Sequence, residues 1–502
     1  MTKELLFKSG KELKKLIKKK EISPVELTKL SLKRIEETEP KINAFFSIMH
    51  EQAISKAKEI ESKVLKNEEL GLLGGLPTSI KDLEPVKDIQ VTKGSLTTGQ
   101  TIADNDQIIV ERIKKEDGII LGKTSCPEFG HSGSNETKLK DHCRNPWNLE
   151  YTSGGSSGGA AASVAVGVNT VAQGSDGGGS VRIPASFCGL FGLIGTQGRI
   201  PRRHAGIMSW LPVNYSRIGP ISWHVEDSAL LFEVMSGPHP ENESMTIQEK
   251  ENFLINIDKG IKGKKIAIPY KFGTRIVDDE VNEIFNINVK LFEKLGANLE
   301  EIKFDFDLND LEQPFHKYLM HTFSSCVNEI FYNIDKNKLM PHVKNTIERG
   351  SKVMAKDYAK ALAQLMEYRF KMEKIFTKYD FIISPTVAIP PHKCNERPNI
   401  IDGKIDISYI DDIEMFEKNN YDYSSWIYVL AQFTAPFNWS GNPAVSIPCG
   451  FTKKGMPVGL QLAGKKKGEL SLIQASIEFE KIKPWHQHRP RICCLLYTSD
   501  AA

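Results

Sequence analysis

Two serines lie in separate glycine-rich segments of the chain, and segments of this kind can support acyl transfer. Ser156 lies in the first segment, and Ser180 directly follows three consecutive glycines in the second. Because glycine accepts positive φ and lets main-chain N–H groups approach a ligand, each turn can present a hydroxyl beside several amide donors. We therefore predict that Ser180 is a nucleophile and that its oxyanion intermediate is held by the N–H groups of Gly177, Gly178, Gly179 and Ser180.

A serine nucleophile needs a base within hydrogen-bond reach, and the residues alone do not identify one. None of the 12 histidines lies in a recognisable catalytic motif. Lys81 follows Ile80 in an apolar segment, where burial would lower its pKa. On its own, however, a lysine beside Asp82 is more typical of an exposed ion pair. The base therefore stays open at this point.

Ser156 also fits the Gly-x-Ser-x-Gly pattern of the nucleophile elbow in α/β-hydrolases. That elbow requires a strand directly before the serine, whereas the preceding residues 144–153 have the character of a loop. A phosphate-binding loop is excluded as well, since neither glycine cluster ends in Gly-Lys-Ser/Thr. Neither motif explains the two segments.

Short apolar runs alternate with longer helical patterns, which is typical of an α/β fold with a sheet covered by helices. Ser23 and Pro24 divide residues 10–38 into two helices, because serine caps a helix and proline fits its first turn. Helical patterns also cover residues 51–67, 278–295 and most of 309–378. The short runs that we expect to form strands are residues 118–122, 160–167, 265–269, 380–386, 444–449 and 458–462.

The composition is that of a globular protein without the charge signature of a nucleic-acid or membrane partner. Apolar residues make up 40% of the chain, and 66 basic against 63 acidic residues leave a net charge of +3. The eight cysteines include no CxxC pair, which argues against a disulfide scaffold or a zinc site. The N-terminal residues lack an apolar secretory segment, so a cytoplasmic location is expected.

No linker, low-complexity tract or internal repeat divides the chain, so we predict a single domain over residues 1–492. Residues 493–502 differ in character from the preceding proline- and histidine-rich stretch and resemble translated adapter sequence. We interpret them as a non-native tail. His486 and His488, just before the tail, are predicted to face solvent, and no metal site is expected there.

The long motif from Gly154 to Pro184 resembles the signature of the amidase signature family, the serine hydrolases that use a Ser-Ser-Lys triad. The likeness continues through Asn145-Pro-Trp to Gly455-Met-Pro-Val-Gly-Leu-Gln-Leu and extends to about Pro490. The resemblance implies an α/β fold with a large mixed β-sheet core covered by helices. It also implies an amidase, which cleaves a carbon–nitrogen bond other than a peptide bond.

The resemblance assigns a role to each residue of the motif. Lys81 would be the neutral general base, and Ser156 would relay the proton between it and Ser180, which attacks the amide carbon to form an acyl-enzyme. The Gly155–Ser156 peptide bond would be cis, as is usual in the family. The supporting residues would be Ser157, which would hydrogen-bond the lysine, and Asp176 and Arg182, which would brace the glycine turn.

Alternatives remain for the function. Gly177 and Ile183 resemble stand-alone amidases such as aryl-acylamidases and hydrolases of 6-aminohexanoate cyclic dimer, a nylon by-product. The A subunit of a tRNA-dependent amidotransferase, which usually has threonine and glutamine at these two places, is the first alternative. A non-catalytic binding module on the same fold is the second, and the presence of all three catalytic side chains opposes it.

The mechanism that the resemblance implies requires no metal or organic cofactor. The expected partner is a small-molecule amide substrate, with no nucleic acid and no membrane, and homodimers are common in the family. Candidate pocket residues, from the segments where the family contacts its substrates, are Trp210, Cys326 and Trp439.

Overall fold

The computed structural model describes residues 2–495 except for 204–214, 270–275, 305–333, 402–403 and 410–428. Trp210 and Cys326, two of the three predicted pocket residues, lie outside the described residues. Among the helices that the structure describes, none combines the length and the apolar character that a membrane span requires.

An eight-stranded mixed sheet forms the centre of the molecule, in the order β10-β9-β11-β15-β14-β7-β8-β6. The β10–β9 and β9–β11 pairs are parallel, and the other pairs are antiparallel. This mixed sheet confirms the predicted fold class. Its strands are β6 (Val171–Asp176), β7 (Phe191–Ile194), β8 (Arg217–Ser222), β9 (Lys265–Pro269), β10 (Asn298–Ile302), β11 (Phe381–Pro385), β14 (Ala444–Phe451) and β15 (Pro457–Gly464).

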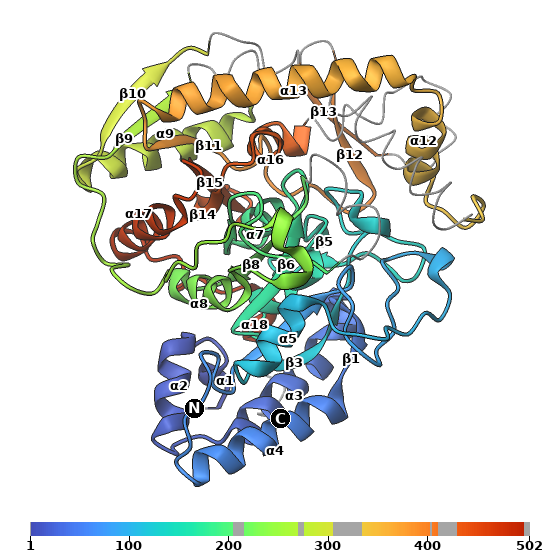
Figure 1. The fold of residues 1–502 in the computed structure, drawn as a ribbon, viewed down its shortest axis with the longest axis vertical. Helices are drawn as coiled ribbons and strands as arrows, with labels where there is room; N and C mark the ends of the chain where they lie inside the picture. Colours follow the sequence, from blue (N-terminus) through green and yellow to red (C-terminus); the bar gives the residue numbers. More distant parts are fainter. Residues whose placement is uncertain are drawn as a thin grey trace.

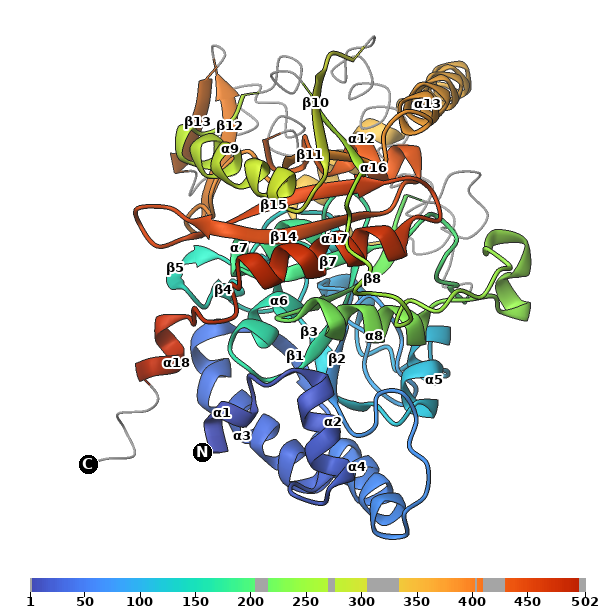
Figure 2. The same ribbon diagram turned by 90° about the vertical axis from the view of Figure 1, so that its left-hand side faces the viewer.

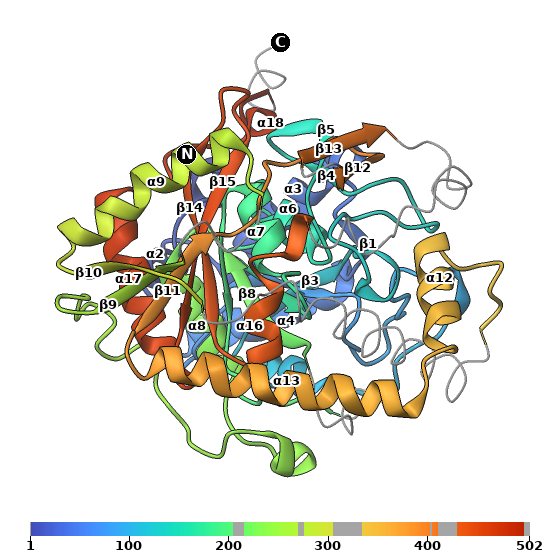
Figure 3. The same cartoon turned by 90° about the horizontal axis from the view of Figure 1, so that it is seen from above.

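Helices cover this sheet and bury its apolar residues (Figure 1). In Figure 2, α9 and α13 lie above β14 and β15, whereas α8 and α17 lie below them. Seen from above, α13 runs along one edge of the molecule, with α12 at the end far from α9 (Figure 3). The helices around the sheet are α6 (Gly158–Ala165), α7 (Arg182–Cys188), α8 (Val225–Met235), α9 (Asp279–Lys294), α12 (Pro341–Gly350), α13 (Ala355–Phe376), α16 (Ala435–Ser440) and α17 (Glu469–Ile482).

A smaller three-stranded sheet, in the order β1-β3-β2, lies beside the N-terminal helices. Strand β2 runs parallel to β3, and β1 runs antiparallel to it. The elements of this region are α1 (Thr2–Leu5), α2 (Gly10–Lys18), α3 (Pro24–Ile42), β1 (Phe45–Ile48), α4 (His50–Leu65), β2 (Pro77–Lys81), α5 (Ile108–Lys115) and β3 (Ile119–Thr124). The remaining elements are the turns η1 (Leu96–Thr98), η2 (Glu128–Gly130) and η4 (Pro240–Met245), the strands β4 (Arg144–Asn145), β5 (Asn148–Thr152), β12 (Glu396–Ile401) and β13 (Lys404–Tyr409), and α18 (Arg491–Leu495).

Most of the predicted elements are present. Ser23 caps α3 in a capping box with Glu26, and Pro24 occupies its first turn. The expected strands at residues 118–122, 265–269, 380–386, 444–449 and 458–462 correspond to β3, β9, β11, β14 and β15. In the helical stretch 309–378, the described part contains α12 and α13.

The strand expected at residues 160–167 is wrong, because this segment forms helix α6. All eight residues of α6 are buried, so the run is apolar on every side and has no helical period that the sequence could reveal. Its four alanines are good helix formers and favour the helix over a strand.

The loop expected at residues 144–153 is wrong in part, because β4 and β5 pair there as a small antiparallel sheet. This pair is separate from the central sheet. Strand β5 also ends at Thr152, so Ser153, Gly154 and Gly155 stand between it and Ser156. The nucleophile elbow, which joins a strand directly to its serine, is therefore still excluded.

The C-terminal boundary at residue 492 stays a prediction. Helix α18 crosses it, and Ile492 and Cys493 are both buried in a cluster with residues of α3, α4 and α6. The structure describes residues up to 495.

Candidate active site

Lys81 is the last residue of β2, and its side chain is fully buried. Its Nζ lies 2.6 Å from Ser156 Oγ, 2.9 Å from Ser157 Oγ and 3.3 Å from the carbonyl oxygen of Ser175. Burial lowers the pKa of Lys81 from 10.5 to about 8, because the ammonium form loses its hydration. The structure therefore brings the lysine together with two of the predicted serines.

The interpretation of Lys81 as an exposed partner of Asp82 is wrong. Asp82 is buried as well, and its Oδ1 pairs with Lys123 Nζ at 2.7 Å. Its Oδ2 accepts hydrogen bonds from the main-chain N–H and the hydroxyl of Thr92. Asp82 therefore pairs with Lys123 and Thr92 and not with Lys81, whose Nζ contacts Ser156 and Ser157 instead.

The Gly155–Ser156 peptide bond is cis, as the resemblance implied. A Cβ on Gly155 would lie 2.5 Å from the carbonyl oxygen of Ser134, so only glycine fits in this packed turn. Helix α6 begins two residues after Ser156, at Gly158. Ser156 and Ser157 are therefore held between a tight turn and the first turn of a buried helix.

Ser180 lies in the connection between β6 and α7 and is half-buried. Its carbonyl oxygen accepts a hydrogen bond of 3.1 Å from the main-chain N–H of Ser157. This bond places the two glycine-rich segments side by side, although α6 and β6 lie between them in the chain. The predicted nucleophile and the predicted relay thus belong to adjoining turns.

The glycine turn before Ser180 offers main-chain donors of two kinds. The N–H of Gly179 donates to Asp176 Oδ1 at 2.7 Å and is therefore occupied. The N–H groups of Gly177, Gly178 and Ser180 donate to no group among the residues that the structure describes. Three of the four predicted oxyanion donors are thus available, and Gly179 is not.

The three glycines of this turn differ in the space around them. Gly179 has a φ of 139°, and a Cβ there would lie 2.3 Å from Thr434 Oγ1, so a side chain is excluded. At Gly177 and Gly178, a Cβ would meet no atom closer than 3.9 Å. A Cβ would therefore make only ordinary van der Waals contacts at these two positions.

The predicted bracing pair, Asp176 and Arg182, is fully buried and holds the turn from inside. Asp176 Oδ2 accepts hydrogen bonds from the N–H groups of Val181 and Arg182 and from the Arg182 side chain. Burial alone would raise the pKa of Asp176, but the guanidinium of Arg182 and the amide of Asn438 hold it well below its usual value. The Asp176 carboxylate is therefore charged, and it accepts hydrogen bonds from the main-chain N–H groups of the glycine turn.

Several residues that support this site were missed by the sequence analysis, because they lie more than 250 residues away. Arg182 Nη1 donates to the carbonyl oxygen of Thr434 and to Gln461 Oε1, and Arg182 Nη2 donates to Asn438 Oδ1. Thr434 Oγ1 in turn donates to the carbonyl oxygen of Gly178 at 2.6 Å. No local pattern around these positions signals a role, since their partners are met only in the folded chain.

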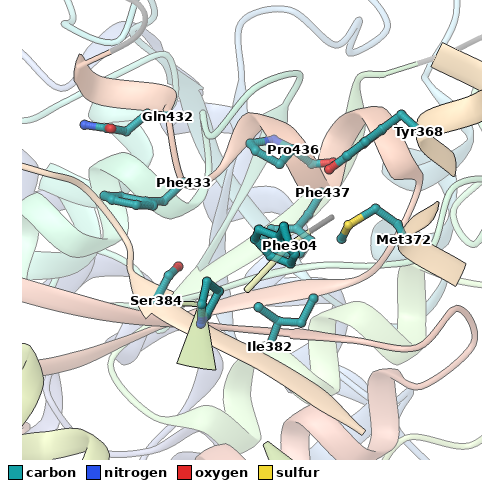
Figure 4. A pocket seen from close by; sticks show the side chains of 10 residues that line it. Phe304, Tyr368, Met372, Ile382, Ser384, Gln432, Phe433, Pro436 and Phe437 are labelled. Carbon is teal, nitrogen blue, oxygen red and sulfur yellow. The ribbon is translucent and has the colours of Figure 1, made fainter. Parts of the chain in front are cut away.

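A small apolar pocket includes residues of the segment 432–437, which contacts the glycine turn through Thr434, and Figure 4 shows the side chains that line it. Gln432, Phe433, Pro436 and Phe437 contribute to its lining, together with Phe304, Tyr368 and Met372. Trp439, the described member of the predicted pocket set, is not part of that lining. It is buried and contacts the ring of Tyr368 edge to face, with ring centroids 6.3 Å apart, as in ordinary core packing.

The chain is similar to known proteins over almost its whole length. The family model described as Amidase matches residues 26–473. The A subunit of glutamyl-tRNA(Gln) amidotransferase from Sulfurihydrogenibium sp. (strain YO3AOP1) is 32% identical, with 97% of this chain and 100% of that protein covered.

Two solved structures are similar over almost the whole chain. A bacterial aryl acylamidase of the amidase signature family has a TM-score of 0.85 at 26% identity, covering 97% of this chain and 98% of that one. A 6-aminohexanoate cyclic dimer hydrolase has a TM-score of 0.83 at 25% identity, covering 97% and 99%. With the family model and the curated relative, they show that this chain belongs to the amidase signature family of enzymes that act on carbon–nitrogen bonds.

Proposed function

We propose that the protein hydrolyses a carboxamide through an acyl-enzyme on Ser180, with Lys81 as the base and Ser156 as the proton relay. The observation that carries this proposal is the fully buried Lys81 Nζ, 2.6 Å from Ser156 Oγ. An amine without water around it loses its proton more readily, and a neutral lysine can act as a base near neutral pH.

In the proposed acylation step, Ser180 Oγ attacks the amide carbon and gives its proton to Ser156, whose own proton passes to Lys81. The carbonyl oxygen becomes an oxyanion and receives hydrogen bonds from the N–H groups of Gly177, Gly178 and Ser180. Gly179 is left out of this set, because its N–H already donates to Asp176. Loss of one such donor typically raises the barrier by about 3 kcal/mol.

The same relay then runs in reverse. Lys81 returns its proton through Ser156 to the leaving amine, and the carbon–nitrogen bond breaks. Water attacks the ester carbon of the acyl-enzyme with the lysine again as base, and Ser180 is regenerated. Asp176 and Arg182 exchange no proton in this scheme, since both are buried and hold the turn in position.

A small aryl or cyclic amide is one candidate substrate. Its support is the match in overall fold to the aryl acylamidase and the 6-aminohexanoate cyclic dimer hydrolase. The glycine turn is not crowded at Gly177, where a Cβ would meet no atom closer than 3.9 Å. The pocket lined by Phe433 and Phe437 adds apolar surface nearby.

Glutamine is the second candidate, as the amide that the A subunit of a tRNA-dependent amidotransferase would cleave. The names of the curated relatives support this function more directly than they support the hydrolysis of aryl or nylon-oligomer amides. In that case the chain would work with partner subunits and not as the homodimer that is common in the family.

The proposed chemistry is tested by labelling with a fluorophosphonate probe and by amide turnover. We expect Ser180→Ala to lose both, and Lys81→Ala to lower the acylation rate by about 10²–10⁴-fold. The exposed Ser351→Ala should behave like the wild type. Mapping of the probe to Ser156 in the wild type would reverse the two serine roles and contradict the proposal.

The substrate is tested by measuring amine or ammonia release from anilides, fatty amides, 6-aminohexanoate cyclic dimer and glutamine. Rapid turnover of an anilide or the cyclic dimer by the chain alone would support the stand-alone hydrolase. Release of ammonia from glutamine alone, strengthened by added amidotransferase subunits, would support the second candidate. No release from any amide, together with no labelling by the probe, would favour the non-catalytic module.

A further inference from the structure

Three metal-ligating side chains meet at a place remote from the catalytic serines. His224 is the residue before α8, Glu480 lies in the last turn of α17, and His486 follows in the connection to α18. Nδ1 of each histidine faces Glu480 Oε1, at 3.7 Å for His224 and 3.9 Å for His486. All the candidate ligand atoms lie within 4.8 Å of one another.

These separations are close to those of a metal-bound set. With metal–ligand distances of about 2.0–2.1 Å, two ligands of a tetrahedral zinc ion are about 3.3 Å apart. The observed separations are too long for direct hydrogen bonds, which end near ~3.2 Å for N–H···O. Small side-chain rotations would therefore bring all three atoms onto one ion.

Two of the three candidate ligand atoms have no hydrogen-bond partner among the described residues. Glu480 Oε1 and His486 Nδ1 are buried and make no hydrogen bond with any residue that the structure describes. Buried polar atoms are normally satisfied, so an orphaned carboxylate oxygen facing an orphaned ring nitrogen indicates a missing partner between them. A divalent cation would satisfy both atoms at once.

Neighbouring main-chain carbonyl groups hold the His224 and His486 rings in place and favour the ring form that binds a cation. The indole N–H of Trp485 donates to the carbonyl oxygen of Trp223 at 2.8 Å, which holds His486 beside His224. Nε2 of His224 lies 3.5 Å from the carbonyl oxygen of Phe7, where a ring N–H would leave Nδ1 unprotonated.

The charges near the cluster act on the two histidines differently. Burial lowers the pKa of His486, which favours the neutral ring that binds metals. Burial also opposes protonation of His224, but Glu480 and Asp227 raise its pKa overall. The same two carboxylates would attract a divalent cation, and Arg489, whose charge also acts on His486, is drawn over the rings of neighbouring aromatic residues.

We propose that His224, Glu480 and His486 form a binding site for a zinc-type divalent cation, with water as the fourth ligand. The sequence predicts solvent-facing side chains at His486 and His488, but His486 is only 32% exposed and His224 only 17%. This partial exposure leaves a path for the ion to enter. The ion ties the segment after α17 to the start of α8.

The site lies away from the proposed chemistry. Strand β8 runs from Arg217, which pairs with Asp176 near the glycine turn, to Ser222, two residues before His224. At about 3.3 Å per strand residue, the two ends of β8 are roughly 17 Å apart, and His224 lies two residues farther along the chain. The ion is therefore structural, and amide turnover does not depend on it.

The experiment uses the purified full chain, stripped with EDTA and then titrated with Zn²⁺ by calorimetry and with Co²⁺ by visible absorption. We expect about one equivalent of Zn²⁺, the d–d absorption of tetrahedral Co²⁺, and a higher melting temperature of the zinc form. His486→Phe and Glu480→Gln should each weaken Zn²⁺ binding by about 100-fold or more. Two variants are used so that one misfolded protein does not decide the test.

His488→Ala is the matched control, because His488 is exposed and lies two residues from His486 outside the cluster. It should bind Zn²⁺ as the wild type does. Equal binding by His488→Ala and His486→Phe, or no stoichiometric binding by the wild type, would overturn the proposal and leave the cluster as an ion pair of His224 with Glu480. Amide turnover after EDTA treatment should stay unchanged in every case.

Discussion

At the scale of single residues, the proposed chemistry depends on the burial of Lys81, whose amine is shielded from water. Lys81 is fully buried, and its Nζ is surrounded by the hydroxyls of Ser156 and Ser157 and the carbonyl oxygen of Ser175. None of these groups carries a charge that would hold the proton on the amine. Burial therefore determines the direction of the pKa shift, and the nearby hydroxyls give the proton a route.

This shift predicts the pH dependence of catalysis. Since the pKa of Lys81 is lowered to about 8, the base is protonated and inactive below that pH and neutral above it. We expect kcat/KM to rise about tenfold per pH unit up to about pH 8 and then to level off. The pH–rate profile of the purified enzyme measures this.

The exposed Lys87→Met should keep the same profile, because its side chain lies outside the buried cluster. A midpoint near ~6.5, the ordinary pKa of histidine, would point to a histidine base instead.

At the scale of elements, three connections meet at the site: the end of β2, the turn into α6 and the turn into α7. Helix α3 contacts the end of α6 opposite to the turn that carries Ser156. Arg34 of α3 is buried, and its Nε donates to the carbonyl oxygen of Val166, which caps the C-terminal end of α6. Helix α3 is therefore attached to α6, the helix that follows Ser156.

This element can be weakened at its first residue. Ser23 Oγ accepts a hydrogen bond of 3.0 Å from the Glu26 N–H, and Glu26 Oε2 accepts one of 2.8 Å from the Ser23 N–H. We expect Ser23→Ala to lower the free energy of unfolding by about 1 kcal/mol, because the capping box is lost. Urea unfolding followed by circular dichroism measures the change.

Ser62→Ala in the interior of α4 is the control. Alanine is the better helix former there, so no loss of stability is expected. If both variants lost the same stability, the cap would not be the cause.

At the scale of the whole molecule, two buried arginines join the first half of the chain to the second. Arg182 reaches Thr434, Asn438 and Gln461, and Arg217 donates to the carbonyl oxygens of Phe437 and Asn442. These bonds fasten the glycine turn to α16 and β15. The site is complete only when both halves are packed together.

Removal of the Asp176 charge beside Arg182 is expected to lower the free energy of unfolding. Asp176→Asn leaves Arg182 buried without its anion, so we expect the free energy of unfolding to fall by about 3–5 kcal/mol. Because the pKa of Asp176 is lowered in the folded state, its stabilisation is complete at neutral pH and is lost only in strong acid. The loss should therefore be constant across the neutral range in urea titrations.

Glu367→Gln removes one partner of an exposed ion pair with Lys371, at 2.8 Å, and serves as the control. A change within about 0.5 kcal/mol is expected there, since exposed pairs contribute little. A similarly small effect for Asp176→Asn would show that the junction is held by packing alone.

The sequence alone determined the local features of this protein. The glycines around Ser156 and Ser180, the cap at Ser23 and the apolar strand runs each act through neighbours in the chain, so their patterns are visible in it. The strand expected at residues 160–167 was wrong because an apolar run buried on every side shows no helical period. Only the tertiary structure decided whether Lys81 is buried, because desolvation comes from the segments packed around it.

Tertiary structure also selected the partners of Arg182 and brought His224 beside His486. The residues in each of these groups are more than 250 positions apart, and nothing in their local sequence marks one for the other. Chemistry that needs a particular residue type in a particular turn can be predicted from sequence. The charge state of a side chain and its long-range contacts cannot be predicted in this way. Both depend on which distant segments pack around the residue and exclude water from it.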